Sequence, residues 1–389
     1  MALTLVSCSK GTLRKGNWEK YNYSALSALI RENGNRSEGY GDRARPYAVF
    51  DFDNTSIIGD IEVATLIYQL EHLELRIAPE TLWNTLTDLY PDIDAPVAGL
   101  DGVSARMLAT DVLNDYIFLF DKYISGSEMS LEQIRKTPQF LDFRAKTYAL
   151  SAGSDALGYE AGCLWILKLF NGMTKDEVRA LAEKAADDAL SRRRLSREIW
   201  VSPDMGEAGR VEVGIIRGLG IAPEMTDLYG TLQENGIDVY ICSASMKEVV
   251  EAVACNPKYG FNVPQDNVYG IRLKGSGIIR AAYDPAWVPT FKEGKVTCIR
   301  TSIAPHHGGR GPILAAGDSN GDYEMLTRFD DLKIGLIINC GNSGGIGELS
   351  ETAASPAGRA EGITGTRYLL QGRDASRKKF VKSTESKKF

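Results

Sequence analysis

The sequence predicts an α/β protein with a helical insertion. Three apolar runs of strand-forming residues, at 47–50, 237–242 and 313–317, each lead into polar residues, and a helical pattern follows the second run. The interval from Ser56 to about Gly214 is too long for a structureless loop, and its apolar residues recur at helical spacing. These two observations indicate a core that contains the strands and a separate helical part.

The first strand leads directly into two carboxylates, Asp51 and Asp53. Strand side chains alternate with a period of two, so both acids point to the same side, and Asn54 then breaks the strand pattern. Two acids on one side repel each other unless a cation lies between them. A hard divalent ion such as Mg²⁺ prefers carboxylate oxygens, waters and substrate phosphate. The alternative is an Asx-turn that merely ends the strand.

Two further segments carry groups that suit a phosphate. Ser243 follows the second strand, and a helical pattern starts at Ser245 or Met246, so a hydroxyl and helix-start amides are available for a phosphate oxygen. Lys295 follows Gly294 at the start of a short helical pattern, where its ammonium would neutralise phosphate charge. The alternatives are that the serines are helix caps and that Lys295 is a solvated lysine.

The third strand again ends in acids and is the most specific of these segments. Asp318, Asn320 and Asp322 alternate as in a calcium-binding EF-hand loop. An EF-hand requires glycine at its sixth position and glutamate at its twelfth, where this chain has Tyr323 and Phe329. Metal-binding acids at a strand end fit the segment better.

The interval after the first acidic segment predicts a helical cap domain. Its helical patterns cover residues 61–75, 108–123, 130–134 and 174–200. The last pattern opens with a capping box from Thr174 to Glu177, in which each of the two side chains satisfies a backbone amide of the other residue. The cap is also rich in aromatic residues, most of which we expect to form its core.

Taken in order, the four segments resemble the haloacid dehalogenase superfamily of phosphohydrolases. The pattern of this superfamily is Asp-x-Asp-x-Thr, then Ser or Thr, then Lys, then Gly-Asp-x-x-x-Asp, and every element occurs here within residues 45–60 and 215–345. The resemblance implies a doubly wound parallel sheet, a Rossmann-like core whose site lies at the carboxyl ends of the strands. It also implies a phosphatase whose cap closes over the site and sets substrate choice.

The resemblance further implies a role for each motif residue. Asp51 becomes the nucleophile that forms an aspartyl-phosphate, and Asp53 becomes the general acid and base. Mg²⁺ would be held by Asp51, the backbone carbonyl of Asp53 and Asp318, with Asp322 supporting the site. The residues implied to bind the transferring phosphoryl group are Thr55, Ser243, Ala244 and Lys295. Such chemistry depends on positioning and charge neutralisation.

Other parts of the chain resemble the phosphorylcholine phosphatase branch of the superfamily, a bacterial exported group beside the phosphoserine phosphatase-like enzymes. These parts are residues 51–62, 170–174 and 223–245. Asp60 and Glu62 are then candidates to contact a cationic leaving group, the alternative being the preference of a helix N-terminus for acids. Val63 stands where the branch often has a second glutamate. The resemblance therefore implies a small phosphomonoester rather than phosphorylcholine in particular.

The composition agrees with a globular enzyme. The 389 residues are 43% hydrophobic and 25% charged, enough for one large core and a separate cap, and the net charge of -6 argues against binding to nucleic acid. We expect a small phosphorylated metabolite as the partner. No apolar run reaches the length of a membrane-spanning helix. The predicted parts are a leader remnant and tether at 1–17, a catalytic core at 18–58 and 215–375, a cap at 59–214 and a basic tail at 376–389.

The first nine residues resemble the end of a bacterial lipoprotein leader in which Cys8 carries the lipid. This resemblance predicts an exported protein, in the periplasm or anchored to the outer membrane, that contacts a membrane only through the lipid. The alternative is a chance Val-Ser-Cys at a cytoplasmic start. The leading functional hypothesis is a Mg²⁺-dependent phosphomonoesterase. The alternatives are a non-catalytic, surface-tethered binding lipoprotein of the same fold and phosphoserine phosphatase-type specificity, and the intact Asp51 and Asp53 favour the enzyme.

Overall fold

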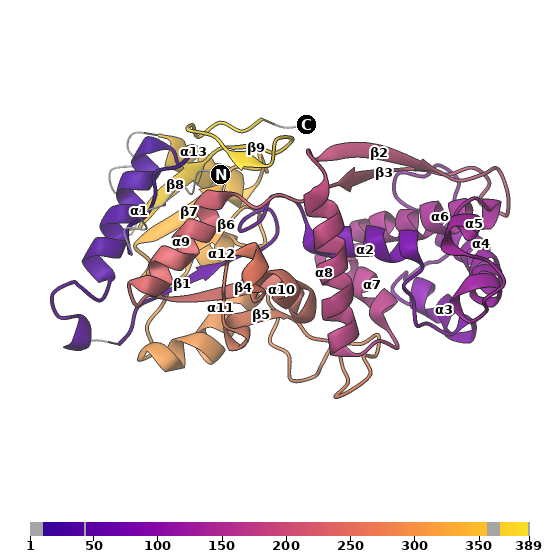
Figure 1. Ribbon diagram of the computed structural model, residues 1–389, viewed down its shortest axis with the longest axis horizontal. Coiled ribbons are helices and arrows are strands. Elements are labelled where there is room, and N and C mark those ends of the chain that lie inside the picture. The colour runs from indigo at the N-terminus through magenta and orange to yellow at the C-terminus, as the bar shows by residue number, and fades with distance from the viewer. Residues whose placement is uncertain (1–10, 43, 356–365, 388–389) are drawn as a thin grey trace, which may run out of the picture. The chain divides into compact units, whose positions relative to one another are not determined.

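The computed structural model describes residues 11–42, 44–355 and 366–387 (Figure 1). The chain divides into two compact units. As far as it is described, the first unit consists of Met1–Asp60, Leu219–Ile271 and Val288–Phe389, and the second of Ile61–Gly218 and Arg272–Trp287. Cys8, the residue predicted to carry a lipid, lies outside the described residues. Among the described residues, no helix combines the length and the apolar character needed to cross a bilayer.

The first unit is built on a six-stranded sheet in the order β5-β4-β1-β6-β7-β8, and every neighbouring pair is parallel. The strands are β1 (Tyr47–Phe50), β4 (Asp238–Met246), β5 (Val268–Ile271), β6 (Leu314–Gly317), β7 (Ile334–Ile338) and β8 (Arg367–Gln371). From β1 the chain adds strands on one side through β4 and β5, and on the other through β6, β7 and β8. The predicted α/β class with a doubly wound parallel sheet is confirmed.

Helices pack on both faces of this sheet. They are α1 (Lys20–Asn33), α9 (Pro223–Glu234), α10 (Lys247–Ala254), α11 (Glu293–Cys298), α12 (Tyr323–Thr327) and α13 (Gly345–Ala354). Val49 of β1 belongs to one core cluster with Val296 of α11 and Met325 of α12. The next residue, Phe50, contacts Tyr229 of α9, with 4.4 Å between the ring centroids. Alternate side chains of a buried strand thus pack against helices on opposite faces.

The second unit is mostly helical. Its elements are α2 (Ile61–His72), α3 (Pro79–Thr87), α4 (Ala105–Leu119), α5 (Leu131–Ile134), α6 (Pro138–Ser154), α7 (Tyr159–Leu167), α8 (Lys175–Ser191), β2 (Ser196–Val201) and β3 (Glu212–Arg217). The predicted capping box at Thr174 and Glu177 is present. The prediction of one helix up to residue 200 was wrong, because β2 pairs antiparallel with β3 and places the strand-forming Ile199 and Trp200 in a ladder.

Residues 272–287 lie within the predicted catalytic core at 215–375, but they cluster with the second unit. Backbone hydrogen bonds explain the difference: the Gly172 amide donates to the Ile279 carbonyl at 3.0 Å, and the Ile279 amide donates to the Met173 carbonyl at 2.7 Å. Within the segment, Leu273 and Tyr283 form an isolated antiparallel bridge. Residues 268–271, which directly precede this segment, form β5 of the parallel sheet.

Neither end of the described chain is the loose tether or tail that the sequence predicted. The Gly11 amide donates to Glu234 at 2.6 Å and the Asn17 amide donates to Glu224 at 2.7 Å, both on α9. Near the C-terminus, β9 (Arg373–Asp374) and β10 (Lys379–Phe380) form an antiparallel pair. The buried ring of Phe380 lies 5.3 Å from that of Trp18. Burial of these two aromatic side chains favours the ordered arrangement.

A buried group of charges lies between α4 and α6 in the second unit. The Lys146 ammonium is 2.8 Å from carboxylate oxygens of both Asp111 and Asp142, and it donates to the Met205 carbonyl. Asp111 also accepts the backbone amides of Glu207 and Ala208 at 2.7 and 2.9 Å. Lys146 is fully buried, and these bonds compensate its loss of hydration.

Asp115 extends this group and lies beside Asp142. Oδ2 of Asp115 and Oδ1 of Asp142 are buried and, within the described part of the chain, accept no hydrogen bond from an N–H or a hydroxyl donor. Burial and the hydrogen bond with Asp142 raise the pKa of Asp115 to about 9. Asp115 is therefore protonated at neutral pH in the folded protein, whereas an unfolded chain releases this proton near pH 4.

Because the folded state alone holds this proton between those two values, stability should fall as the pH rises from about 4 towards 9. Asp115→Asn keeps a neutral group at the position, so it should remove this part of the pH dependence. The difference in unfolding free energy between the variant and wild type should grow by more than about 1.4 kcal/mol from pH 5 to pH 8.5, since one pKa unit corresponds to that energy. Urea unfolding of the full chain at several pH values measures it. The exposed Asp101→Asn is the control. If the unfolding free energies of Asp115→Asn and wild type changed with pH in parallel, that result would contradict the raised pKa of Asp115.

Candidate active site

Three carboxylates lie close together in the first unit, and two of them contact one buried lysine. Asp51 follows β1, and its amide donates to the Ala316 carbonyl of β6 at 2.9 Å. The Lys295 ammonium, on α11, lies 2.7 Å from Oδ1 of Asp51 and 2.6 Å from Oδ1 of Asp322. Carboxylate oxygens of Asp51, Asp318 and Asp322 all lie within 4.8 Å of one another. The parallel sheet explains this convergence, because the carboxyl ends of neighbouring strands meet at one edge.

The loop after β6 holds Asp322 in a fixed orientation. Oδ2 of Asp322 accepts the amides of Asp318 and Ser319, both at 3.1 Å, and the Ser319 hydroxyl at 3.2 Å. Gly317 is required here because a Cβ atom at this position would lie 2.4 Å from Cβ of Asp322. Lys295 bonds the other oxygen of Asp322, so both oxygens of this carboxylate are engaged by the protein.

The acids oppose one another's ionisation. Burial, then the charge of Asp322, raise the pKa of Asp51 to about 6, although Lys295 acts in the opposite direction. Burial and the charges of Asp322 and Asp51 raise the pKa of Asp318 to about 8. The one ammonium among three carboxylates leaves an excess of negative charge in a buried space. A set of carboxylate oxygens with this excess fits a hard divalent cation such as Mg²⁺.

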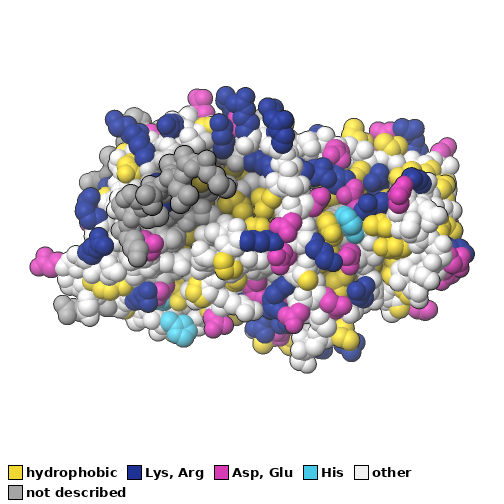
Figure 2. Space-filling view, viewed as in Figure 1, with side chains coloured by type: hydrophobic (Ala, Val, Ile, Leu, Met, Phe, Trp, Pro, Cys, Tyr) yellow, Lys and Arg dark blue, Asp and Glu magenta, His cyan; other side chains and the backbone are white. Residues whose placement is uncertain are grey.

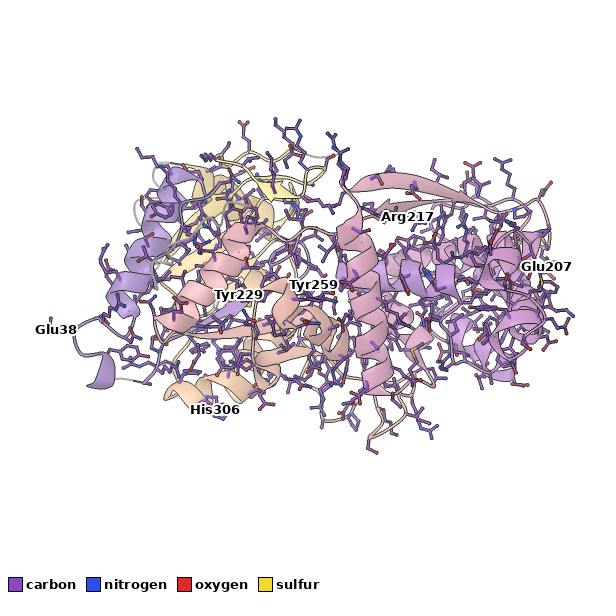
Figure 3. All side chains as sticks on the ribbon, in the orientation of Figure 1. Glu38, Glu207, Arg217, Tyr229, Tyr259 and His306 are labelled. Atoms are coloured by element: carbon purple, nitrogen blue, oxygen red, sulfur yellow. The ribbon has the colours of Figure 1, made fainter. Side chains whose placement is uncertain are left out.

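The loop after Asp51 carries two further predicted site residues, Asp53 and Thr55, and the neighbouring Ser56. Oδ2 of Asp53 accepts the Ser245 hydroxyl at 2.6 Å. The Thr55 hydroxyl donates to Oδ1 of Asp318 at 3.1 Å, so it contacts an acid of the cluster. Ser56 donates to the Asp51 carbonyl at 2.6 Å, and its hydroxyl also lies 2.6 Å from that of Tyr229, which is labelled in Figure 3.

Ser243 and Ala244 lie within β4, not at the predicted start of a helix. The strand continues to Met246, and α10 begins at Lys247. Its pairing with β5 shifts register between Cys242 and Met246. The buried Ser243 hydroxyl accepts the Ser245 amide at 3.1 Å.

The sequence predicts Ser245 at the start of a helix and gives a helix cap as its alternative role, whereas its hydroxyl binds the predicted general acid. The signal that would have found it is strand alternation, which turns residues two apart to the same side. Ser243 and Ser245 are two apart in β4, and a strand up to Met246 would have placed both on the side of the acids.

The two acids predicted to contact the leaving group fall in different units. Asp60 is half-buried and is the residue at which the first unit's N-terminal stretch ends. Glu62 is buried in the first turn of α2, in the second unit. Within that unit, burial followed by the charges of Cys163, Glu160 and Glu62 raises the pKa of Tyr283. Glu62 is therefore close to an aromatic residue of its own unit.

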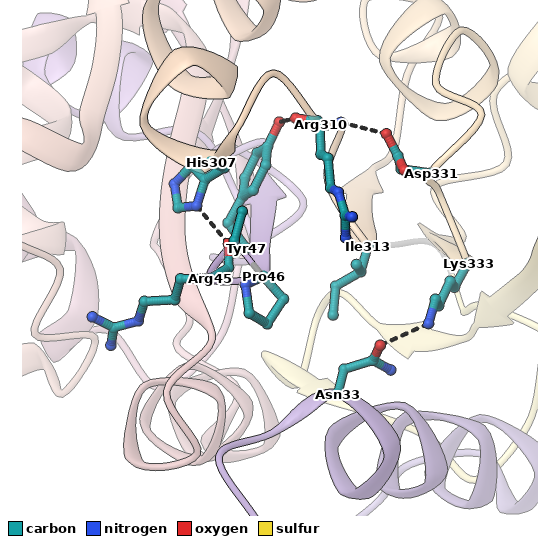
Figure 4. A pocket seen from close by; sticks show the side chains of 11 residues that line it. Asn33, Arg45, Pro46, Tyr47, His307, Arg310, Ile313, Asp331 and Lys333 are labelled. Atoms are coloured by element: carbon teal, nitrogen blue, oxygen red, sulfur yellow. Dashed lines mark hydrogen bonds between the residues drawn. The ribbon is translucent and has the colours of Figure 1, made fainter. Parts of the chain in front are cut away.

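A separate pocket of about 90 Å³ contains none of the predicted site residues (Figure 4). It is lined by Tyr47, at the start of β1, and by Ile313 and Lys333, which immediately precede β6 and β7. These positions are the amino ends of the strands, opposite to the acids. In its wall Lys333 donates to Asn33 at 2.7 Å, and Nδ1 of His307 lies 2.7 Å from the Arg45 carbonyl.

On the face of the molecule drawn in Figure 2, basic side chains are interspersed with acidic ones, and no broad basic face covers it. Electrostatic binding to nucleic acid depends on a basic stripe or patch.

Comparisons with known proteins agree with this arrangement. The model of the haloacid dehalogenase-like hydrolases matches residues 140–327. Phosphorylcholine phosphatase of Pseudomonas aeruginosa is 27% identical over 329 residues, which cover 77% of this chain and 74% of that protein.

Among solved structures, a conserved protein of unknown function from Anaerococcus prevotii is similar with a TM-score of 0.89 and 31% identity, covering 98% of this chain and 99% of the other. A phosphoserine phosphohydrolase-like protein from Francisella tularensis has a TM-score of 0.31 and 14% identity, over 75% of this chain and 87% of the other. The prediction of an enzyme is confirmed by the family match. The chain carries a haloacid dehalogenase-like hydrolase domain.

Proposed function

We propose that this hydrolase cleaves small phosphomonoesters through a covalent intermediate on Asp51. The observation that carries the proposal is the buried contact of 2.7 Å between Asp51 and the Lys295 ammonium, beside Asp318 and Asp322. A carboxylate nucleophile needs cationic groups nearby, because it attacks a phosphoryl group that is itself negative. A binding protein of the same fold would gain nothing from keeping such a carboxylate next to a second acid.

The residues that would hold Mg²⁺ are Asp51, Asp318 and the backbone carbonyl of Asp53, with Asp322 fixed behind them. A bound Mg²⁺ supplies charge neutralisation at the phosphoryl oxygens. Asp322 has both oxygens engaged by Lys295 and by the loop amides, so it serves mainly to position Lys295 and the loop.

In the first step, Lys295 and the Ser243 hydroxyl bind the phosphoryl oxygens while a carboxylate oxygen of Asp51 attacks phosphorus. The ester P–O bond breaks, and Asp53 gives its proton to the leaving alkoxide. In the second step, Asp53 takes a proton from water, and the resulting hydroxide attacks the aspartyl-phosphate and releases inorganic phosphate and Asp51. The Ser245 hydroxyl, 2.6 Å from Asp53, keeps this acid oriented in both steps.

The substrate we propose has a small cationic leaving group, of which phosphorylcholine is the first example to test. A related protein is named a phosphorylcholine phosphatase. In the second unit, Glu62 provides a buried carboxylate near Tyr283, and the Tyr283 ring stacks on that of Trp287 with 4.7 Å between centroids. A carboxylate beside stacked aromatic faces suits a quaternary or primary ammonium group.

Asp51→Asn should reduce turnover by about 10³-fold or more, since catalytic groups that act as a unit lose nearly all of their effect when the nucleophile is removed. Turnover is measured with phosphorylcholine, phosphoethanolamine, phosphoserine and p-nitrophenyl phosphate, by release of inorganic phosphate. The exposed Asp330→Asn serves as the matched control. Turnover by Asp51→Asn at the rate of the control would contradict the covalent mechanism.

Asp53→Asn should separate the two steps. With an alkyl ester such as phosphorylcholine, the loss of general acid catalysis should cost about 10²- to 10⁴-fold in rate. With p-nitrophenyl phosphate, whose leaving group needs no proton, we expect a stoichiometric burst of p-nitrophenol followed by slow turnover, because only hydrolysis of the intermediate still needs the base. Rapid-quench measurements detect the burst. Equal losses for both esters, without a burst, would contradict the role of Asp53.

Removal of divalent cations with EDTA should abolish turnover, because the phosphoryl charge then faces three carboxylates without the cation that would neutralise it. Addition of Mg²⁺ in excess over the chelator should restore it, and the melting temperature should rise with Mg²⁺ in wild type more than in Asp318→Ala. Undiminished turnover after dialysis against EDTA would exclude a metal-dependent reaction.

A further inference from the structure

We propose that Arg373 is a positioning residue that holds the catalytic loop in its working conformation, so that the C-terminal segment is part of the active site. This inference rests on the proposed function of the loop that carries Asp51 and Asp53. Arg373 lies near the end of the predicted catalytic core at 215–375, and the residues that hold it belong to the predicted basic tail at 376–389.

The loop contains a backbone conformation that needs support. Asn54, between Asp53 and Thr55, has a φ of +57°. This value lies in the left-handed region, which residues other than glycine adopt uncommonly. Its amide donates to the Gly59 carbonyl at 2.9 Å. Such conformations persist where surrounding contacts determine them, and they occur often at functional sites. The turn at Asn54 decides where the side chains before and after it point.

Arg373 provides this support through both ends of its guanidinium group. Nη1 donates to the Asn54 carbonyl at 3.0 Å, and Nη2 donates to Oδ1 of Asn54 at 3.1 Å. The side chain of Arg373 is buried. A planar fork that binds the backbone and the side chain of one residue fixes both, which a lysine ammonium cannot reproduce. The guanidinium charge also opposes the rise in the pKa of Asp318.

The position of Arg373 depends in turn on the last described residues of the chain. Its amide donates to the Ser386 hydroxyl at 2.8 Å, and its carbonyl accepts the Lys387 amide at 2.8 Å. The Ser386 hydroxyl donates to the Asn339 carbonyl, directly after β7. The preceding Gly372 is enclosed by the same segment, because a Cβ atom there would lie 2.2 Å from the Glu385 carbonyl oxygen. The segment therefore connects the end of the sheet to the catalytic loop.

The test compares Arg373→Ala and Arg373→Lys with Arg377→Ala, an exposed neighbour that faces Asp374. We expect kcat of Arg373→Ala to fall about 10- to 100-fold, as for a small misplacement of reacting groups, with KM changed less than about twofold. Added guanidinium at non-denaturing concentration should restore a substantial part of kcat in Arg373→Ala and have no such effect on wild type or Arg377→Ala. Arg373→Lys should show an intermediate loss, because an ammonium can replace one of the two bonds.

Hydrogen exchange of the peptide covering residues 51–60 gives a readout that does not need a substrate. Exchange should be faster in Arg373→Ala than in Arg377→Ala, while peptides from the second unit exchange alike in both. If wild type hydrolyses no phosphomonoester, the proposed function fails, yet this exchange comparison still tests the contact with the loop. Equal exchange in the two variants, or a kcat loss in Arg373→Ala that guanidinium does not relieve, would overturn the positioning role.

Discussion

The bridge from Lys295 to Asp51 and Asp322 is the interaction on which the rest of the first unit depends. Burial of an ammonium and of carboxylates is costly unless each charge has a partner, and removal of one member exposes the others to the full cost. The bridge joins a helix, the end of the central strand and the loop after β6. The bridge therefore supports the fold and also brings together the groups that we propose to react. The same residues serve both stability and the proposed chemistry.

The sequence predicted the fold class and the acids of the site because both follow from local rules. Apolar runs that end in Asp51, Ser243 and Asp318 indicate strands, and parallel strands bring their carboxyl ends to one edge. Lys295 lay in a weak pattern by itself. Its place beside Asp51 follows from the order of the four motifs, and a short segment alone would not have revealed it.

The remainder of the site and fold depends on contacts between distant segments, which no local pattern encodes. Ser245 and Arg373 each bind the loop that carries Asp51 and Asp53 from another part of the chain. Strand alternation would have indicated the side to which Ser245 points, whereas the residues around Arg373 give no indication of its contact with Asn54. The same holds for residues 272–287, which pair with 172–174. The burial of Lys146 could not be predicted for a further reason: a lysine is normally solvated, and one of its two acids, Asp111, comes from a different helix.

The central position of β1 has a consequence for how the chain folds. Both of its neighbours, β4 and β6, follow it only after the whole stretch Ile61–Gly218 has intervened. During synthesis β1 must therefore emerge long before any partner strand exists, and closure of such distant pairs is slow. The residues of the second unit are mostly contiguous and rich in local helical contacts, so a nascent chain would acquire that structure first. The carboxylate of Asp51, the proposed nucleophile, is thus made before the partner strands of β1 and is among the last groups to reach its final surroundings.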